Sequence, residues 1–256
     1  MESGKKKIEL YENSNQLICA AIDRIVVEIF NKKKCEKGQT VLLTGCSPLA
    51  GTTSTCIGLA IAMANTKRKT ILVDCDVRKT VQYKKLNKEI SQGLADYLLE
   101  EEDGKIEISD ILYETNVEDL SYIPCGSSLE NSTRILCSPQ MTDLISKLQQ
   151  KFDCIIFDLP SLAVVPDAQV LFPTMDGIVL VTALNETRKR QIKDAKRKIA
   201  PYSDRYYGMI INKVEKDLYR ANLKDYDYYF VDKNGEQKLT GAIHRKYKER
   251  SRQEEN

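Results

Sequence analysis

Residues 41–55 of this 256-residue chain, VLLTGCSPLAGTTST, constrain its fold more than any other stretch. The apolar residues 41–43 indicate a buried strand, a glycine turn opens at Gly45, and a helical pattern follows over 54–64. This order directs backbone N–H groups and a helix N-terminus at a phosphate. The usual pattern is G-x-x-x-x-G-K-[ST], and here Thr52 stands where the lysine is expected.

Short apolar segments alternate with helical patterns over the central part of the chain, and this alternation is typical of an α/β fold. The apolar segments are unbroken, which predicts strands buried on both faces. We therefore expect a doubly wound, mostly parallel sheet with helices on both faces, of the P-loop NTPase-like type, with ligands at the carboxyl ends of the strands. The expected strands are 41–44, 70–73, 120–123, 154–157, 178–181 and 209–211, and the expected helices are 54–66, 91–100, 139–151, 166–173 and 187–199.

Composition narrows the class of protein. The net charge of only +2 lacks the strongly basic character that is typical of nucleic-acid-binding proteins. The chain has no apolar run of about 18 residues, so we expect no membrane span, and the lysines of MESGKKKIEL precede no apolar signal segment. The eight cysteines form no C-x-x-C pair and several lie in apolar runs, which favours a reducing, cytoplasmic location without disulfides. The one histidine, His244, lies in the charged C-terminal part, which argues against a serine or cysteine hydrolase.

Three segments are expected: 1–36, 37–215 and 216–256. The first has a polar, loose start over 1–13 and then an amphipathic helix with isoleucines at helical spacing. That stripe either packs on the domain's own core or forms a surface for a neighbouring subunit. The second segment is the α/β domain. The third is a charged, tyrosine-bearing tail with few aliphatic residues, which we expect to be flexible or weakly ordered.

Acidic residues end two of the expected strands. In ILVDCDVRK, Asp74 and Asp76 point to the same side of an extended chain, with Arg78 close behind. In CIIFDLPS, Asp158 follows a buried apolar run, as a Walker B carboxylate does. Carboxylates at these strand ends, beside a glycine loop, predict a hydrated Mg²⁺ next to phosphates.

Three motifs together resemble the bacterial tyrosine kinase family of the capsule and exopolysaccharide type, within the deviant P-loop group that includes partitioning and division-site ATPases. They are TGCSPLAGTTST, ILVDCDVRK and IIFDLPSLAVVPDAQVL, with SQGLADYLL and MDGIVLVT in support. The resemblance covers roughly residues 14–215.

The resemblance implies an ATP·Mg²⁺ site. Thr53, Asp76 and Asp158 would organise the metal, and Asp74 would be the base for a tyrosine hydroxyl. Asn212 would contact the adenine. The nucleotide phosphates would be held by Gly45, Cys46, Ser47, Pro48, Gly51, Thr52, Thr53 and Ser54, together with Arg78.

It also implies partners and a substrate. A membrane adaptor, or polysaccharide co-polymerase protein, would recruit the chain to the inner face of the cell membrane, and the chain would self-associate. The substrate would be a cluster of tyrosines in the tail: Tyr226, Tyr228 and Tyr229, with Tyr219 nearby.

The chain departs from the family pattern in several places. Thr52 replaces the lysine, Ser47 replaces a second lysine of the related ATPases, and Ser161 replaces the second proline of the third motif. The N-terminal helix, NQLICAAIDRIV, keeps only two charges of the family's E-x-x-R-x-x-R pattern. Three hypotheses stand: a protein-tyrosine (auto)kinase with a degenerate loop, a catalytically weak or inactive nucleotide-binding regulatory module of the same fold, and a partitioning-type ATPase.

Overall fold

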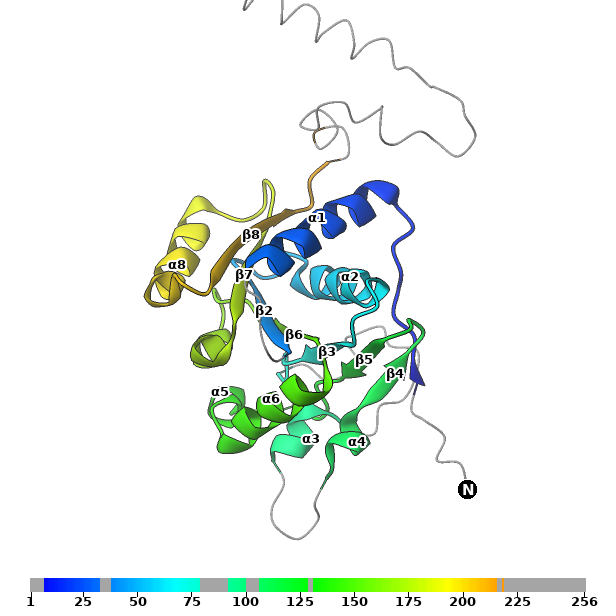
Figure 1. Cartoon of the computed structure of the whole chain (residues 1–256). Coiled ribbons are helices and arrows are strands. Elements are labelled where there is room, and N and C mark those ends of the chain that lie inside the picture. Colours follow the sequence, from blue (N-terminus) through cyan, green and yellow to red (C-terminus); the bar gives the residue numbers. More distant parts are fainter. Residues whose placement is uncertain are drawn as a thin grey trace, which may run out of the picture. The chain divides into compact units, whose positions relative to one another are not determined.

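The computed structural model describes residues 7–32, 38–78, 92–99, 106–128, 131–215 and Leu218 (Figure 1). The chain divides into two compact units, Met1–Val214 and Glu215–Asn256, and nearly all described residues belong to the first. The three tail tyrosines expected to be phosphorylated lie outside the described residues.

The described residues of the first unit form one eight-stranded sheet. All strand pairs are parallel except β4 with β5, so the predicted mostly parallel α/β fold is confirmed. In spatial order the strands are β1 (Lys7–Ile8), β4 (Tyr113–Thr115), β5 (Leu120–Ile123), β3 (Thr70–Asp74), β6 (Cys154–Leu159), β2 (Gln39–Gly45), β7 (Gly177–Ala183) and β8 (Tyr206–Asn212).

Two of these strands were not predicted. Strand β4 reaches β5 through a four-residue turn, and a connection that short permits only antiparallel pairing. The second unpredicted strand is β1, and the prediction of a loose segment over residues 1–13 was wrong for residues 7–10. Ile8 and Leu10 are buried, and the Asn116 side chain accepts from Leu10 N at 2.7 Å and donates to Leu10 O at 3.2 Å.

Helices cover both faces of the sheet. Because side chains alternate along a strand, each face has its own buried cluster. On one face lie α1 (Gln16–Lys32) and α2 (Thr52–Asn65). The other face carries α3 (Leu94–Leu98), α4 (Ile108–Ile111), α5 (Ser132–Leu136), α6 (Pro139–Lys151), α7 (Asp167–Leu171) and α8 (Lys189–Ile199).

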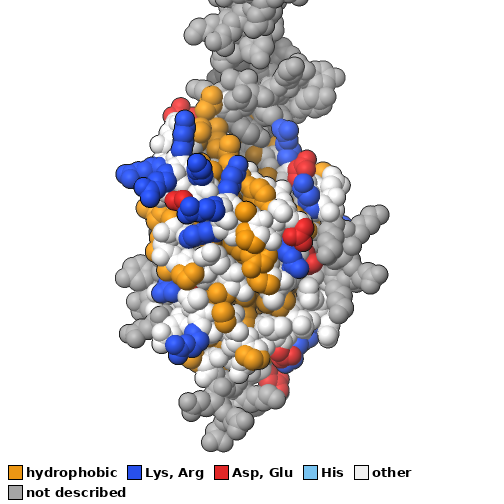
Figure 2. Space-filling view, turned by 90° about the vertical axis from the view of Figure 1, so that its left-hand side faces the viewer, with side chains coloured by type: hydrophobic (Ala, Val, Ile, Leu, Met, Phe, Trp, Pro, Cys, Tyr) orange, Lys and Arg blue, Asp and Glu red, His pale blue; other side chains and the backbone are white. Residues whose placement is uncertain are grey.

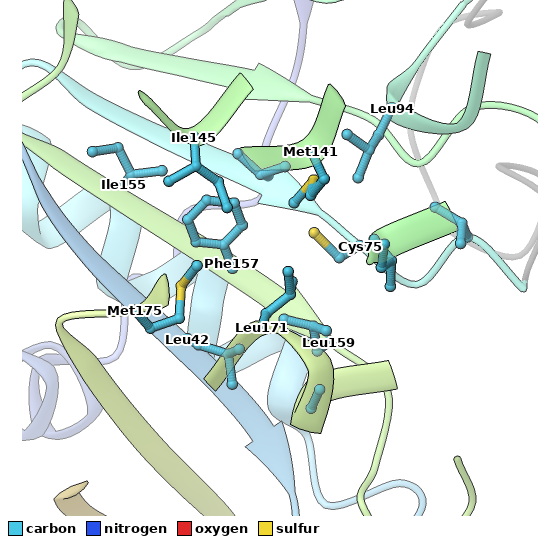
Figure 3. Close-up of a cluster of buried hydrophobic side chains, with 14 of the residues drawn as sticks. Leu42, Cys75, Leu94, Met141, Ile145, Ile155, Phe157, Leu159, Leu171 and Met175 are labelled. Atoms are coloured by element: carbon cyan, nitrogen blue, oxygen red, sulfur yellow. The ribbon is translucent and has the colours of Figure 1, made fainter. Parts of the chain in front are cut away.

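Figure 3 shows the cluster beneath α6 and α7. Phe157 of β6 lies at its centre, with Ile145 of α6, Leu171 of α7 and Met175 around it. Strands β2, β6 and β7 are buried along their whole length, as their unbroken apolar runs predicted. A sheet held on both faces gives a rigid base for the residues at its carboxyl edge.

The isoleucine stripe of α1 packs on the domain's own core over most of its length. Ile29 is buried, Ile22 and Ile25 pack against the same cluster, and a Cβ added to Gly58 of α2 would lie 2.6 Å from Ile22 Cδ1. Ile18 keeps 42% of its surface exposed. Within the described ranges, no helix has the length and apolar character needed to cross a bilayer.

Candidate nucleotide and metal site

The glycine loop connects β2 to α2, as predicted, and its shape depends on its last glycine. Gly51 has φ of +83°, in the left-handed region, and the helix begins at the next residue, Thr52. Thr53 and Ser54 are exposed in the first turn of α2. The N–H groups of this turn have no partner within the helix and are therefore suited to an anion.

The start of the loop is hydrogen-bonded to the segment that follows β6 and to strand β7. Gly45 O accepts two hydrogen bonds at 3.0 Å, one from Ser161 Oγ and one from Leu162 N. Cys46 N donates to Val181 O at 2.8 Å. Ser161, which departs from the family's proline, thus anchors the start of the loop.

Hydroxyl and amide side chains hold the middle of the loop. The Oγ of Ser47 and the Oγ1 of Thr187 lie 2.8 Å apart, at hydrogen-bond distance. Asn212, at the end of β8, donates from Nδ2 to Ala50 O at 3.0 Å. The predicted adenine contact therefore lies directly against the phosphate loop.

Thr52 occupies the lysine position and turns its hydroxyl back towards the start of the loop. A Cβ placed on Gly45 would lie 3.0 Å from Thr52 Oγ1. A threonine supplies a neutral hydroxyl here, where lysine would supply a positive charge.

The three predicted aspartates lie at the carboxyl edge of the sheet. Asp74 and Asp158 are register partners on the adjacent strands β3 and β6, and Asp76 follows β3. All three are buried, with exposures of 2%, 3% and 6% for Asp74, Asp158 and Asp76. The sheet brings two separate sequence motifs to neighbouring positions.

Asp74 has a hydrogen-bond donor on each carboxylate oxygen. Asp76 N donates to Oδ1 at 3.0 Å, and the hydroxyl of Tyr122 donates to Oδ2 at 3.1 Å. Burial and the neighbouring Asp74 raise the pKa of Tyr122 well above its usual value, so the phenol stays protonated and remains a donor.

Arg78 forms a bidentate salt bridge with Asp167, the first residue of α7. Its Nε lies 2.9 Å from Asp167 Oδ2 and its terminal Nη2 lies 3.0 Å from Oδ1. Ser132 and Thr133 of α5 also donate to this fully buried carboxylate. Burial alone would raise the pKa of Asp167, but the hydrogen bonds from Arg78, Thr133 and Ser132 lower it.

The loop cysteine is inert. Cys46 is buried, and burial raises the pKa of its thiol to about 11, against a lowering influence of Lys196. A thiol that stays protonated at neutral pH is a poor nucleophile. Cys46 contributes its backbone N–H and its bulk to the loop.

The carboxylates do not form a ready-made metal cage. In the part of the chain that the structure describes, no group of three or more His, Cys, Asp or Glu side chains is arranged to hold a metal ion. Mg²⁺ in nucleotide sites takes one or two carboxylates and completes its shell with phosphate oxygens and water. Asp76 and Asp158 fit that use because both lie at the loop end of the sheet.

Sequence reasoning missed three residues that shape this site: Tyr122, Asp167 and Thr187. Asp167 was within a quoted motif, and its position directly after the apolar and proline residues 162–166 was the only signal. Tyr122 looked like an ordinary strand residue, since only the pairing of β5 with β3 brings it to Asp74.

Comparison with known proteins agrees with this geometry. A family model described as an AAA domain matches residues 49–193. The tyrosine-protein kinase CpsD of Streptococcus pneumoniae serotype 4 is 30% identical over 216 residues, covering 84% of this chain and 91% of that protein. The tyrosine-protein kinase YwqD of Bacillus subtilis is 30% identical over 200 residues, covering 78% and 81%.

Solved structures share the fold. The chimerical protein CapA2B2 superposes with a TM-score of 0.72 at 24% identity, over 82% of this chain and 94% of that one. A more distant likeness, with a TM-score of 0.53 at 16% identity over 72% and 76% of the two chains, is to the septum site-determining protein MinD of Pyrococcus horikoshii, solved with Mg-ADP. The phosphate loop, the paired aspartates and these relatives agree: the chain belongs to the bacterial tyrosine-protein kinase family of the capsule and exopolysaccharide type.

Proposed function

We propose that this chain is an ATP-dependent protein-tyrosine kinase that acts in capsule or exopolysaccharide synthesis and phosphorylates its own tail. The observation that carries the proposal is the pairing of Asp74 with Asp158 at the carboxyl edge of the sheet, next to a phosphate loop that keeps its shape. Buried carboxylates repel one another unless a cation lies between them or a proton is bound. A Mg²⁺·nucleotide complex supplies that cation.

Each part of the site has a proposed role. The loop N–H groups and the first turn of α2 would hold the phosphates, and Thr53, Asp76 and Asp158 would hold Mg²⁺. Asn212 would lie beside the adenine, since its amide already contacts the loop. Arg78 was expected at the phosphates, but its guanidinium is directed at the carboxylate of Asp167. Its proposed role is therefore to hold the segment after β3, and with it Asp76, in place.

The reaction would be an in-line phosphoryl transfer. The tyrosine oxygen forms a bond to the γ-phosphorus while the bond from that phosphorus to the bridging oxygen breaks, and ADP leaves. Asp74 would take the phenolic proton as general base. Tyr226, Tyr228 and Tyr229 are the proposed acceptors.

One specific observation favours a second candidate function: Thr52 stands where the family pattern has a lysine. Removing a positioned donor or cation from developing transition-state charge costs about 3 kcal/mol, roughly a hundredfold in rate. The loop, residues 44–55, contains no lysine. Without a substitute cation, from Lys79 or from a neighbouring subunit, the same fold would be a nucleotide-binding regulatory module with weak or no catalysis. A partitioning-type ATPase ranks third, because the tail carries clustered tyrosines.

The proposed partner is a membrane adaptor, or polysaccharide co-polymerase protein, that recruits the chain to the inner face of the cell membrane. The relatives include the tyrosine-protein kinase wzc of Salmonella typhimurium, of which this chain spans 29%. Self-association is also proposed, with the exposed part of α1 around Ile18 as a candidate surface.

The test is phosphotyrosine mass spectrometry after incubation of the full chain with ATP and Mg²⁺, with and without the adaptor's cytoplasmic segment. The kinase proposal expects phosphate on the tail tyrosines in the native chain and none in Asp158→Asn. Nucleotide binding without phosphate in either condition would support the regulatory module. Phosphate release without phosphotyrosine would support the ATPase.

A further inference from the structure

Tyr122 lies in the candidate active site without a place in the mechanism above. Its phenol is buried, with 4% of the residue exposed, and its hydroxyl is 3.1 Å from the Oδ2 of Asp74. Asp74 is the residue proposed as base, and its other oxygen already accepts from Asp76 N. A buried tyrosine therefore determines where one oxygen of the base is directed.

The register of the sheet makes this contact possible. Tyr122 of β5 is opposite Leu72 of β3, two residues before Asp74. Two residues of strand advance about 6.6 Å, which is close to the reach of a tyrosine side chain. Leu72 and Asp74 are on the same face because side chains alternate. The phenol therefore runs along the sheet towards the carboxyl edge and ends at the carboxylate.

We propose that Tyr122 is a positioning residue for phosphoryl transfer: its hydroxyl fixes the orientation of the Asp74 carboxylate so that the oxygen which takes the phenolic proton faces the acceptor tyrosine. The inference rests on the proposed kinase function. A carboxylate can turn about its terminal bond at little cost, since this torsion has broad minima. Donors on both oxygens remove that freedom before the substrate arrives, which is what a preorganised base requires.

The chain offers a matched control. Tyr113 of β4 is the register partner of Tyr122, is equally buried, and donates its hydroxyl to the carbonyl of Gln92 at 3.0 Å. Tyr113→Phe removes a phenol hydroxyl of the same kind from the same sheet, but one that is bonded to a backbone carbonyl. Any general cost of losing a buried hydroxyl appears in both variants.

The kinetic experiment measures tyrosine phosphorylation by the full, adaptor-activated chain. Tyr122→Phe is expected to lower kcat about tenfold or more while KM for ATP changes less than about twofold, because orientation of the base is a transition-state effect. Tyr113→Phe should leave kcat within about twofold. In an Asp74→Asn background Tyr122→Phe should add no further loss, since the group it positions has been removed. Equal losses in both backgrounds, or an unchanged kcat in Tyr122→Phe, would overturn the inference.

A structural experiment needs no turnover. Crystal structures of the native chain and of Tyr122→Phe, each with Mg²⁺ and ADP, are expected to show one Asp74 orientation bonded to Tyr122 in the first and a rotated or divided carboxylate in the second. An Asp74 that turns away from Tyr122 in the native complex, or keeps its orientation in Tyr122→Phe, would overturn the positioning role. A native chain that binds ADP but transfers no phosphate would instead contradict the proposed function. The two crystal structures would still show whether Tyr122 determines the orientation of Asp74.

Discussion

Arg78 and Asp167 form a two-pronged ion pair, with Nε and Nη2 at 2.9 and 3.0 Å from the two carboxylate oxygens. Arg78 closes the motif that carries Asp74 and Asp76, and Asp167 begins α7, which follows the loop after Asp158. The pair thus joins the two acidic motifs of the site to each other. Its parallel N–H···O bonds fix orientation as well as distance.

Breaking this pair should destabilise the fold. Arg78→Ala leaves a fully buried carboxylate with fewer donors, and we expect a loss of about 2–3 kcal/mol in the free energy of unfolding, below the value for a fully buried pair because Arg78 is 35% exposed. Urea unfolding at neutral pH measures it. The control is Lys147→Ala, which removes a half-exposed i,i+4 pair with Asp143 and should leave the free energy of unfolding nearly unchanged. Equal effects of the two variants would contradict the assignment.

The same carboxylate predicts a pH dependence of stability. The pKa of Asp167 is lowered in the folded state, so the folded chain binds this proton less readily than the unfolded chain. The stability it contributes is complete above the ordinary pKa of an aspartate and is lost as the pH falls through the lower, folded value. The native chain should therefore lose more stability on acidification than Asp167→Asn does. Parallel acid dependence of the two proteins, by urea unfolding across this range, would refute the assignment.

The glycine loop contains one residue that must be glycine and one that would be better as glycine. Gly51 has φ of +83°, and an added Cβ would lie 2.1 Å from Asn212 Nδ2, displacing the amide from Ala50 O. Gly51→Ala should lower the free energy of unfolding by about 2 kcal/mol or more. Leu49 also has positive φ, 59°, and is 85% exposed, so Leu49→Gly should be neutral or stabilise by up to about 1 kcal/mol. Thermal unfolding that ranks the two variants the other way would contradict this loop geometry.

Thr182 is a candidate for stabilisation. Among the described residues its Oγ1 is the one buried side-chain oxygen or nitrogen that makes no hydrogen bond. Thr182→Val replaces the hydroxyl with a methyl of similar size and should stabilise by about 1 kcal/mol. Thr70→Val is the matched control, since Thr70 Oγ1 donates to Arg68 O at 2.9 Å and its loss should destabilise by about 1 kcal/mol. Chemical denaturation would show shifts of opposite sign, and shifts of the same sign would argue against the prediction.

The sequence was sufficient to predict the elements that depend on local patterns. The unbroken apolar runs located six strands, and α6 was expected and found at 139–151, where Ser138 caps the helix and Pro139 begins it. Strand β1 could not be predicted, because two residues carry no periodicity and its pairing depends on β4, far along the chain. The loop and its three aspartates could be placed from motifs, since each follows a buried strand.

The contacts between motifs depended on the three-dimensional fold. Asp74 meets Tyr122 only because β5 lies next to β3, and Arg78 meets Asp167 only because α7 packs beside the end of β3. The basic surface around α8 also depends on the fold. Figure 2 shows the side of the molecule on which α8 lies, with Lys and Arg side chains gathered there. The basic residues could be read from the sequence but their gathering on this side could not; the exposed ones at the start of α8 and along it are Arg188, Lys189, Arg190, Lys193, Lys196 and Arg197.

Calorimetric binding of ATP·Mg²⁺ to the purified full chain, to Asp76→Ala and to Thr52→Lys tests the proposed nucleotide site most directly. We expect micromolar binding by the native chain, loss of binding in Asp76→Ala, and tighter binding in Thr52→Lys, because the loop keeps its shape and lacks only a cation. Absence of binding by both the native chain and Thr52→Lys, in proteins shown to be folded, would contradict this expectation, since neither the loop nor the aspartates would then be a nucleotide site.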